Sequence, residues 1–261
     1  MFGHPKGLQT LFFTEFWERF SFYGIRAILV LYMTAATEFG GLGFTTAKAA
    51  TIYGWYLMLV YLTALPGGII ADRWMGQRRA VMVGGAIIAM GNFALVVNSV
   101  PSFYFGLTLI IIGTGFLKPN VSTMVGGLYD QGDPRRDGGF TIFYMGINLG
   151  AFLAPLLVGY IAQSSGFLSF VHSLGIDLVA GWNWAFALAG IGMIFGLIQF
   201  KISGDRLLGD VGLAPSRSPR NSSGDTTAER EKFTTDDRRR LAVIGVLFFF
   251  SMLFWAFFEQ A

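Results

Sequence analysis

The chain has 261 residues, of which 53% are hydrophobic, 16% aromatic and only 13% charged, with a net charge of +3. A soluble domain carries roughly a quarter charged residues, so this composition excludes an ordinary soluble protein and indicates a polytopic membrane protein. No cysteine is present, and the two histidines, His4 and His172, lie far apart in expected loops. Thiolate metal sites are therefore excluded, and we expect no metal, no cofactor and no nucleic-acid partner.

Seven apolar runs are long enough to cross a bilayer as helices, which takes about 20 residues each. They are residues 8–34, 51–71, 80–97, 103–127, 139–162, 182–200 and 241–258. The predicted fold class is therefore all-α, a transmembrane helical bundle whose surroundings are the lipid bilayer.

Lysine and arginine are concentrated in alternate loops. The loops after the second, fourth and sixth runs carry almost all of them, whereas the opposite loops share only Lys48. Cytoplasmic loops carry the excess of positive charge. We therefore expect the amino terminus and the basic loops to be cytoplasmic, in a cell inner membrane or plasma membrane.

Residues 203–240 are polar and rich in Ser, Pro and Arg, which predicts a flexible cytoplasmic linker. It separates a six-helix bundle over residues 1–202 from a seventh helix within residues 241–261. The last run ends on Glu259 with no following loop. We therefore expect the chain to be a portion of a longer protein.

The first run contains four ionisable residues at membrane depth, namely Glu15, Glu18, Arg19 and Arg26. On a helix of 3.6 residues per turn they share one face with Phe22 and Tyr23. Charge is costly in hydrocarbon, so this face must point into protein or water and is a functional-site hypothesis by default. A buried carboxylate can also carry a proton. The alternative is an ion-pair network that only locks helices together.

The junction of the second and third runs contains a spaced set of residues: Gly68, Asp72, Arg73, Gly76, Arg78 and Arg79. Gly68 would allow close helix approach, Asp72 can cap and pair, and Gly76 permits a tight turn. The pattern resembles the cytoplasmic signature of the major facilitator superfamily, where it latches helices in one conformational state. A generic basic loop would explain the arginines but not the spacing of glycine and aspartate.

Three further polar positions lie inside apolar runs. Lys118 precedes Pro119, which bends a helix, and lies roughly 15 Å from the nearest loop, too far to snorkel to the surface. Asn148 lies between glycines and either contacts a substrate or joins two helices. Trp255 and Glu259 share a face of the seventh run. The intramembrane acids and bases then balance at three each.

Together these segments resemble the proton-dependent oligopeptide transporter (POT) family of the major facilitator superfamily. The resemblance rests on Glu15-x-x-Glu18-Arg19-Phe20, on Lys118-Pro119-Asn120, on residues 140–152 and on the Phe-Trp-x-x-Phe-Glu-Gln ending. It implies two six-helix bundles that rock about a central peptide site, driven by inward proton flow. This chain would supply the first bundle and the first helix of the second, and the remaining C-terminal helices would be its partners.

The resemblance also implies roles for individual residues. Those implied to line the peptide site are Tyr23, Arg26, Tyr61, Lys118, Asn148 and Trp255. Those implied to serve proton coupling are Glu15, Glu18, Arg19 and Glu259. The family motif has two tyrosines before the glycine, whereas this chain has Phe22 and Tyr23, so one peptide-facing hydroxyl is absent.

The predicted function is proton-coupled symport of di- and tripeptides by alternating access. A peptide zwitterion needs cations at one pole, for which Arg26 and Lys118 are candidates, and an acid such as Glu259 at the other. One alternative is a transporter of the same fold for nitrate or another small anion. Another is a non-transporting membrane scaffold or regulator. An enzyme is not expected, because no nucleophile–base or metal constellation is present.

Overall fold

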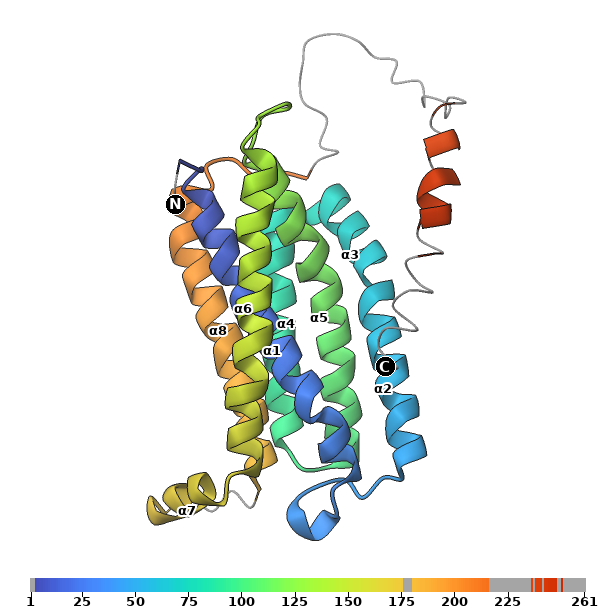
Figure 1. Ribbon diagram of the computed structural model, residues 1–261, viewed down its shortest axis with the longest axis vertical. Helices are drawn as coiled ribbons and strands as arrows, with labels where there is room; N and C mark the ends of the chain where they lie inside the picture. The colour runs from blue at the N-terminus through green and yellow to red at the C-terminus, as the bar shows by residue number, and fades with distance from the viewer. Residues whose placement is uncertain are drawn as a thin grey trace. The chain divides into compact units, whose positions relative to one another are not determined.

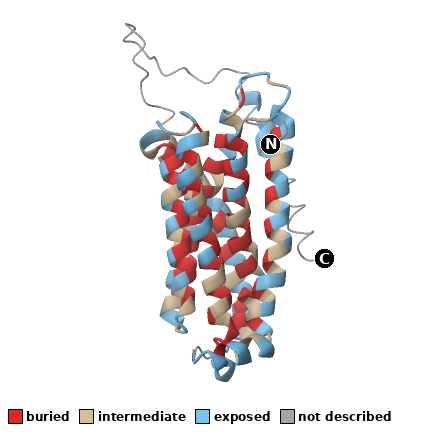
Figure 2. Cartoon of the chain, turned by 90° about the vertical axis from the view of Figure 1, so that its left-hand side faces the viewer, coloured by how far each residue is buried: buried red, intermediate tan, exposed pale blue. Residues whose placement is uncertain are grey.

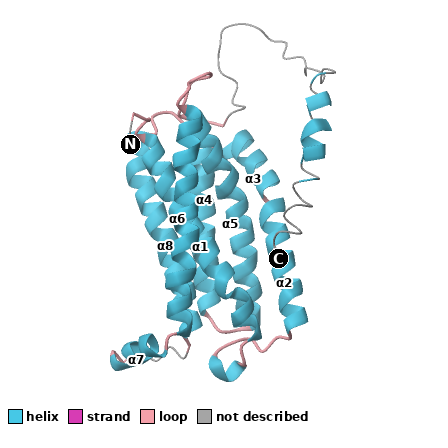
Figure 3. Cartoon of the chain, in the orientation of Figure 1, coloured by secondary structure: helices cyan, strands magenta, loops and turns pink. Residues whose placement is uncertain are grey.

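The computed structural model describes residues 3–175 and 180–215 and, nearer the C-terminus, residues 236, 238–240, 242–247 and 250. The chain divides into two units, Met1–Ser218 and Pro219–Ala261, and each is described by itself. All regular elements among the described residues are helices (Figure 3). This agrees with the predicted all-α class.

Unit 1 is built from long, roughly parallel helical rods (Figure 1). Its elements in chain order are α1 (Gly7–Thr34), the 3-10 turn η1 (Thr37–Phe39), α2 (Thr46–Leu62), α3 (Ala64–Ile70), the π-helical turn η2 (Ala71–Met75), α4 (Gln77–Val96), α5 (Val100–Gly127), α6 (Arg136–Gln163), α7 (Ser165–Ser173) and α8 (Gly181–Leu207). The rods coincide with the first six apolar runs of the sequence.

Five helical segments within the described residues are long and apolar enough to cross a membrane: Thr46–Met75, α4, α5, α6 and α8. The first helix, α1, is equally long at 28 residues, but it carries the four charged residues of the first run. These lengths and compositions are those of a multi-pass membrane protein.

Three elements differ from the sequence prediction. The second span runs from Thr46 to Met75 and is interrupted at Thr63, where α2 ends and α3 begins. The loop after the fifth run contains α7, which starts where the Ser164 hydroxyl accepts a hydrogen bond from the Phe167 amide, at 3.2 Å. The sixth span continues to Leu207, so the predicted bundle boundary at residue 202 falls inside a helix.

In unit 2 the described residues are helical, and they include Arg238–Arg240. Residues 238–240, which were assigned to the linker, are therefore helical. The predicted seventh helix otherwise lies mostly outside the described residues.

The helices of unit 1 pack around α1, which lies against α6 and α8, while α4 packs on α5 and α8. Small residues permit the closest of these contacts. A Cβ added to Gly84 of α4 would lie 2.6 Å from the Gly113 carbonyl oxygen of α5, so the two backbones meet directly. Buried residues line the facing sides of the rods and exposed ones their outer sides (Figure 2).

The apolar core of unit 1 forms two clusters, one toward each end of α1. Leu8 and Leu11 belong to the first cluster, whereas Ile25 and Tyr32 belong to the second. Three charged residues of the first run, Glu15, Glu18 and Arg19, lie on α1 between these two sets. The fold therefore holds a polar segment between two apolar cores.

Candidate functional site

The acidic and basic residues of α1 form a buried ionic cluster. The exposed fractions of Glu15, Glu18 and Arg19 are only 3%, 1% and 4%. Arg19 Nε lies 3.1 Å from Glu15 Oε1, one helical turn away, and also donates a hydrogen bond to Glu18. Two carboxylates thus share one guanidinium, on a face that points into protein.

Aromatic rings cover this cluster. The guanidinium carbon of Arg19 lies 5.0 Å from the centre of the Phe22 ring. The Tyr56 ring of α2 stacks on this Phe22 ring, with 6.4 Å between the two ring centroids. Such cation–ring contacts are strongest where water is excluded.

Lys118 of α5 faces the same region. It is half-buried and interacts electrostatically with Arg19, Glu18 and Glu15. Its ammonium nitrogen lies 4.1 Å from the centre of the Tyr61 ring. The structure therefore joins two predicted peptide-site residues, Lys118 and Tyr61, to each other and to the ionic cluster.

Arg26, two helical turns further along α1, belongs to a second cationic contact. Its Nε donates a hydrogen bond of 2.7 Å to the Tyr53 hydroxyl, and its guanidinium carbon lies 5.9 Å from the Tyr23 ring centre. Tyr53 and Tyr56 were missed by the sequence analysis. Their signal is the spacing of three tyrosines, Tyr53, Tyr56 and Tyr61, along one helix.

The remaining predicted peptide-site residues are less closely joined. Asn148 is exposed on α6, and no hydrogen bond of its side chain is found within the described part of the chain. Its predicted alternative role, joining two helices of this unit, is therefore not observed. Trp255 and Glu259 lie outside the described residues.

The predicted latch is built around the turn between η2 and α4. Gly76 adopts a φ of 77°, the left-handed conformation that a tight glycine turn requires. The close helix approach predicted at Gly68 occurs at Gly67 instead, where an added Cβ would collide with the Gly115 carbonyl of α5. The Gly68 position has 3.8 Å of space to Pro119. Asp72 is half-buried in η2, and Arg73 is exposed there.

Arg78 and Arg79 have different environments. Arg79 is exposed, whereas Arg78 is buried. Arg78 Nε donates to the Val211 carbonyl at 2.7 Å, its Nη2 donates to the Gly209 carbonyl, and its backbone amide donates to the Gly212 carbonyl at 2.9 Å. Arg78 thus holds the segment after α8 against the start of α4. This segment had been assigned to the flexible linker.

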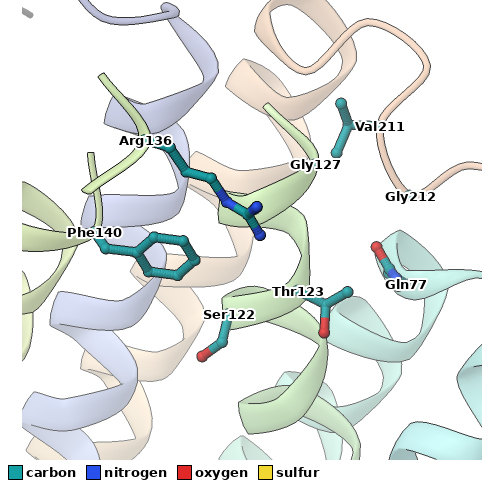
Figure 4. A pocket seen from close by; sticks show the side chains of 9 residues that line it. Gln77, Ser122, Thr123, Gly127, Arg136, Phe140, Val211 and Gly212 are labelled. Atoms are coloured by element: carbon teal, nitrogen blue, oxygen red, sulfur yellow. The ribbon is translucent and has the colours of Figure 1, made fainter. Parts of the chain in front are cut away.

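A groove of about 650 Å³ lies beside this contact (Figure 4). It is lined by Gln77, Ser122, Thr123, Gly126, Gly127, Arg136, Phe140, Val211 and Gly212. Its one cation, Arg136, lies over the Phe140 ring at 5.9 Å. Of the predicted proton-coupling and peptide-site residues that the structure describes, none lines this groove, so it is separate from the Glu15–Glu18–Arg19 cluster and its neighbours.

The loop between α5 and α6 contains an exposed ion pair. Arg135 donates hydrogen bonds to the Asp133 carboxylate, the shortest at 2.7 Å, and to the Gly3 carbonyl at 2.9 Å. The bonds from Arg135 lower the pKa of Asp133 to about 2. Because this value lies below that of an unfolded aspartate, the pair's contribution to stability is present above about pH 4 and is lost as the pH falls through 2.

Unit 1 therefore combines three features. It has membrane-length helices, it has an ionic cluster that lies between two apolar clusters, and it has contacts between cations and tyrosines beside the ionic cluster. Intramembrane ionisable groups that face the bundle interior mark ion and substrate pathways. This arrangement defines the class of the protein as a multi-pass helical membrane protein with a buried ionic site.

Comparison with known proteins identifies the family. The family model described as the POT family matches residues 78–216, and the chain belongs to this family. A peptide transporter of Yersinia enterocolitica is 45% identical over 203 residues, which cover 77% of this chain and 37% of the relative. A di-/tripeptide transporter of Lactococcus lactis is 46% identical over 218 residues, which cover 82% and 41%.

A solved structure shows the same fold. The crystal structure of a mutant peptide transporter POT in complex with alafosfalin matches with a TM-score of 0.75 and 41% identity, covering 98% of this chain and 47% of that chain. The chain spans about two fifths of the length of the curated relatives it matches. Membership of a transporter family agrees with the expectation that the protein is not an enzyme.

Proposed function

We propose that this chain forms the first helical bundle of a proton-coupled symporter that imports di- and tripeptides by alternating access. The observation that carries the proposal is the buried Glu15–Glu18–Arg19 cluster, together with Lys118 and Arg26 beside it. The matched relatives are named as peptide and di-/tripeptide transporters, which supports this substrate class.

Proton coupling follows from the balance of charge in the cluster. Arg19 contacts both Glu15 and Glu18, so one guanidinium serves two carboxylates, and the second negative charge is offset by nearby Lys118. A substrate carboxylate that binds Lys118 withdraws this positive charge from the cluster. One carboxylate then takes up a proton, because an uncompensated buried charge is costly.

Peptide recognition follows from the cation–tyrosine contacts. Lys118 over Tyr61 and Arg26 bonded to Tyr53 each present a positive charge beside an aromatic wall, which suits a carboxylate next to a variable side chain. Tyr61 is exposed on unit 1. Asn148 would face the same substrate, and Trp255 and Glu259 of the seventh helix would complete the site at the amine pole.

The orientation belongs to the same proposal. The amino terminus, the basic loops and the linker lie in the cytoplasm, and the protein lies in the inner or plasma membrane. The remaining C-terminal helices form a second bundle. Substrate and protons cross when the two bundles rock about the shared site.

The test is uptake of labelled dialanine into liposomes. We expect the full-length transporter that contains this chain to accumulate dialanine only with an inward proton gradient. The 261-residue chain alone should insert without transporting, because a lone bundle has no second bundle to rock against.

Each other outcome rejects a different part of the proposal. Accumulation that is independent of the gradient would exclude proton coupling, and accumulation of nitrate in place of dialanine would favour the anion alternative. Gradient-driven uptake by the 261-residue chain alone would show that two copies of it form the transporter. Absence of any uptake by the full-length protein would favour a scaffold.

A further inference from the structure

Helix α7 differs from the long rods of unit 1 in its direction. It begins at Ser165, directly after α6 ends at Gln163, and it lies across the end of the bundle instead of along it (Figure 1). Only Ser164 separates the two helices, and its hydroxyl caps α7 by accepting the hydrogen bond from the Phe167 amide. The chain therefore turns sideways at the end of a membrane-length helix.

The residues of α7 and of the position that follows it form two opposite faces. The apolar face consists of Phe167, Phe170, Val171 and Leu174. The polar face consists of the exposed residues Ser165, Ser169 and His172. Both sets follow the three- and four-residue spacing that places side chains on one side of a helix. Residues 164–175 contain no Lys, Arg, Asp or Glu, so α7 is amphipathic without being charged.

The bundle covers only half of the apolar face. Phe167 packs edge-on against Trp184 of α8, with 6.2 Å between the ring centroids, and only 4% of Val171 is exposed. Phe170 and Leu174, in contrast, have exposed fractions of 60% and 59%. Within the described residues, two large apolar side chains thus continue the packed stripe of α7 without being covered themselves.

The length of α6 places α7 near the lipid headgroups. With 28 residues, α6 rises by about 42 Å, which is close to the thickness of about 40–45 Å of a bilayer with its headgroup regions. A helix that starts where α6 ends and then runs sideways stays at that level.

The start of α8 gives the same level independently. Trp184, the contact of Phe167, stands with Trp182 in the first turn of α8. Tryptophan is enriched where a membrane span meets water. Because Phe167 touches one of these two tryptophans, α7 lies at the depth of the interface between membrane and water.

We propose that α7 is an interfacial helix that lies on the lipid bilayer, with Phe170 and Leu174 inserted among the acyl chains and with Ser169 and His172 in water. Interfacial helices bind through buried apolar area and through attraction of basic residues to anionic lipids. Since α7 has no lysine or arginine, apolar burial alone holds it, and a neutral phospholipid surface suffices. This contact is separate from the ionic cluster and does not depend on the cargo.

The test measures the depth of single spin labels on α7 in the full-length transporter, reconstituted in liposomes of neutral phospholipid. This chain contains no cysteine, so labels can be attached at introduced cysteines once any cysteine in the remainder of the transporter is replaced by serine. The test position is Phe170→Cys. The matched control is Ser169→Cys, the adjacent residue on the opposite face.

Collisions of each label are measured with oxygen, which concentrates in hydrocarbon, and with a water-soluble nickel complex. We expect the label at position 170 to lie about 5–10 Å below the lipid phosphates and to collide mainly with oxygen. The label at position 169 should collide mainly with the nickel complex.

Every other pattern overturns the proposal. Collisions of both labels mainly with nickel would place α7 in water, and collisions of both mainly with oxygen would place it inside the hydrocarbon. A label at position 170 that is shielded from both reagents would show that protein covers this face, either the second bundle or another copy of the transporter.

A charge on the apolar face gives a second measurement, with the label at Leu174→Cys. Adding Phe170→Asp should raise this label from its depth of about 5–10 Å to the level of the phosphates, because a carboxylate opposes burial in lipid. Adding Ser169→Asp puts the same charge on the polar face and should leave the depth unchanged. Equal depths for the two variants would overturn the proposal. No transport is involved, so failure of this inference is distinguishable from failure of the proposed function.

Discussion

At the scale of single residues, Arg19 is the residue that both buried acids need. Glu15 and Glu18 each contact its side chain. Removing Arg19 would leave buried carboxylates unpaired, at a cost of about 3–5 kcal/mol, so such a variant reports on folding as much as on transport. Substitution of one acid is the better probe, because the other acid still pairs with the arginine.

Glu18→Gln should abolish gradient-driven accumulation of dialanine and retain counterflow exchange. Glutamine keeps the size of the side chain but does not titrate, and Arg19 keeps its 3.1 Å contact with Glu15. Exchange needs substrate movement without net proton movement. The control is Glu38→Gln, the same change at an exposed residue. Loss of both activities in a folded Glu18→Gln protein would assign Glu18 to structure instead.

Lys118→Ala should weaken dialanine uptake far more than Lys6→Ala. Lys118 is half-buried beside Tyr61, whereas Lys6 is exposed at the start of α1. Loss of one charged hydrogen bond to a peptide carboxylate costs about 2 kcal/mol, or roughly thirtyfold in apparent affinity. The measurement is the concentration dependence of uptake in liposomes. Similar losses for both variants would remove Lys118 from the peptide site.

At the scale of elements, Arg78 connects two parts of the chain that the sequence places far apart. It bonds the backbone at Gly209 and Val211 through its side chain, and it stands at the start of α4. The basic motif at this junction therefore has a role within one bundle, fixing where the chain leaves α8, in addition to any latch between conformational states.

Arg78→Gln should destabilise the protein by about 2 kcal/mol, because it removes hydrogen bonds from a charged donor to two carbonyls. Hydrogen exchange should rise at residues 209–213 and remain unchanged in the middle of α1. The control is Arg79→Gln, at the neighbouring exposed residue. It should change neither the stability of the protein nor its hydrogen exchange. Equal melting temperatures in detergent for both variants would contradict the prediction.

The spans could be predicted from the sequence because each is set by a run of apolar residues. The interruption at Thr63 could not be predicted this way, since apolar composition continues across it. The Thr63 hydroxyl donates to the Ile111 carbonyl of α5 at 3.0 Å, which is a contact between helices. The short helix α7 was also missed, because it is too short to give a membrane-length signal.

In the candidate site, too, contacts within one helix could be predicted from the sequence, whereas contacts between helices could not. Glu15, Glu18 and Arg19 could be placed together because they lie on one helix, whose period is known. The contact of Tyr53 with Arg26 and the contact of Tyr56 with Phe22 could not be predicted, because both depend on how α2 is positioned against α1. The exposure of Asn148 likewise depends on how α6 packs.

At the scale of the whole molecule, the described bundle holds Glu15, Glu18 and Arg19 in one layer. The two apolar clusters of unit 1 lie toward the two ends of α1, and the layer of charge lies between them. Lys118 from α5 joins this layer. Packing on both sides of the layer keeps water out, which strengthens every electrostatic interaction within it.

This layer has a consequence for biosynthesis. A charged residue at the centre of a helix opposes its insertion by about 2.5–3.5 kcal/mol, so α1 is the least able of the described spans to enter lipid alone. Its packing partners α6 and α8 begin only at Arg136 and Gly181. We expect α1 to remain beside the insertion machinery until α6 and α8 emerge.

Glycosylation mapping should show poor insertion of isolated α1, and efficient insertion of the same helix with Glu15, Glu18 and Arg19 changed to leucine. Efficient insertion of the unaltered helix alone would contradict this order of assembly.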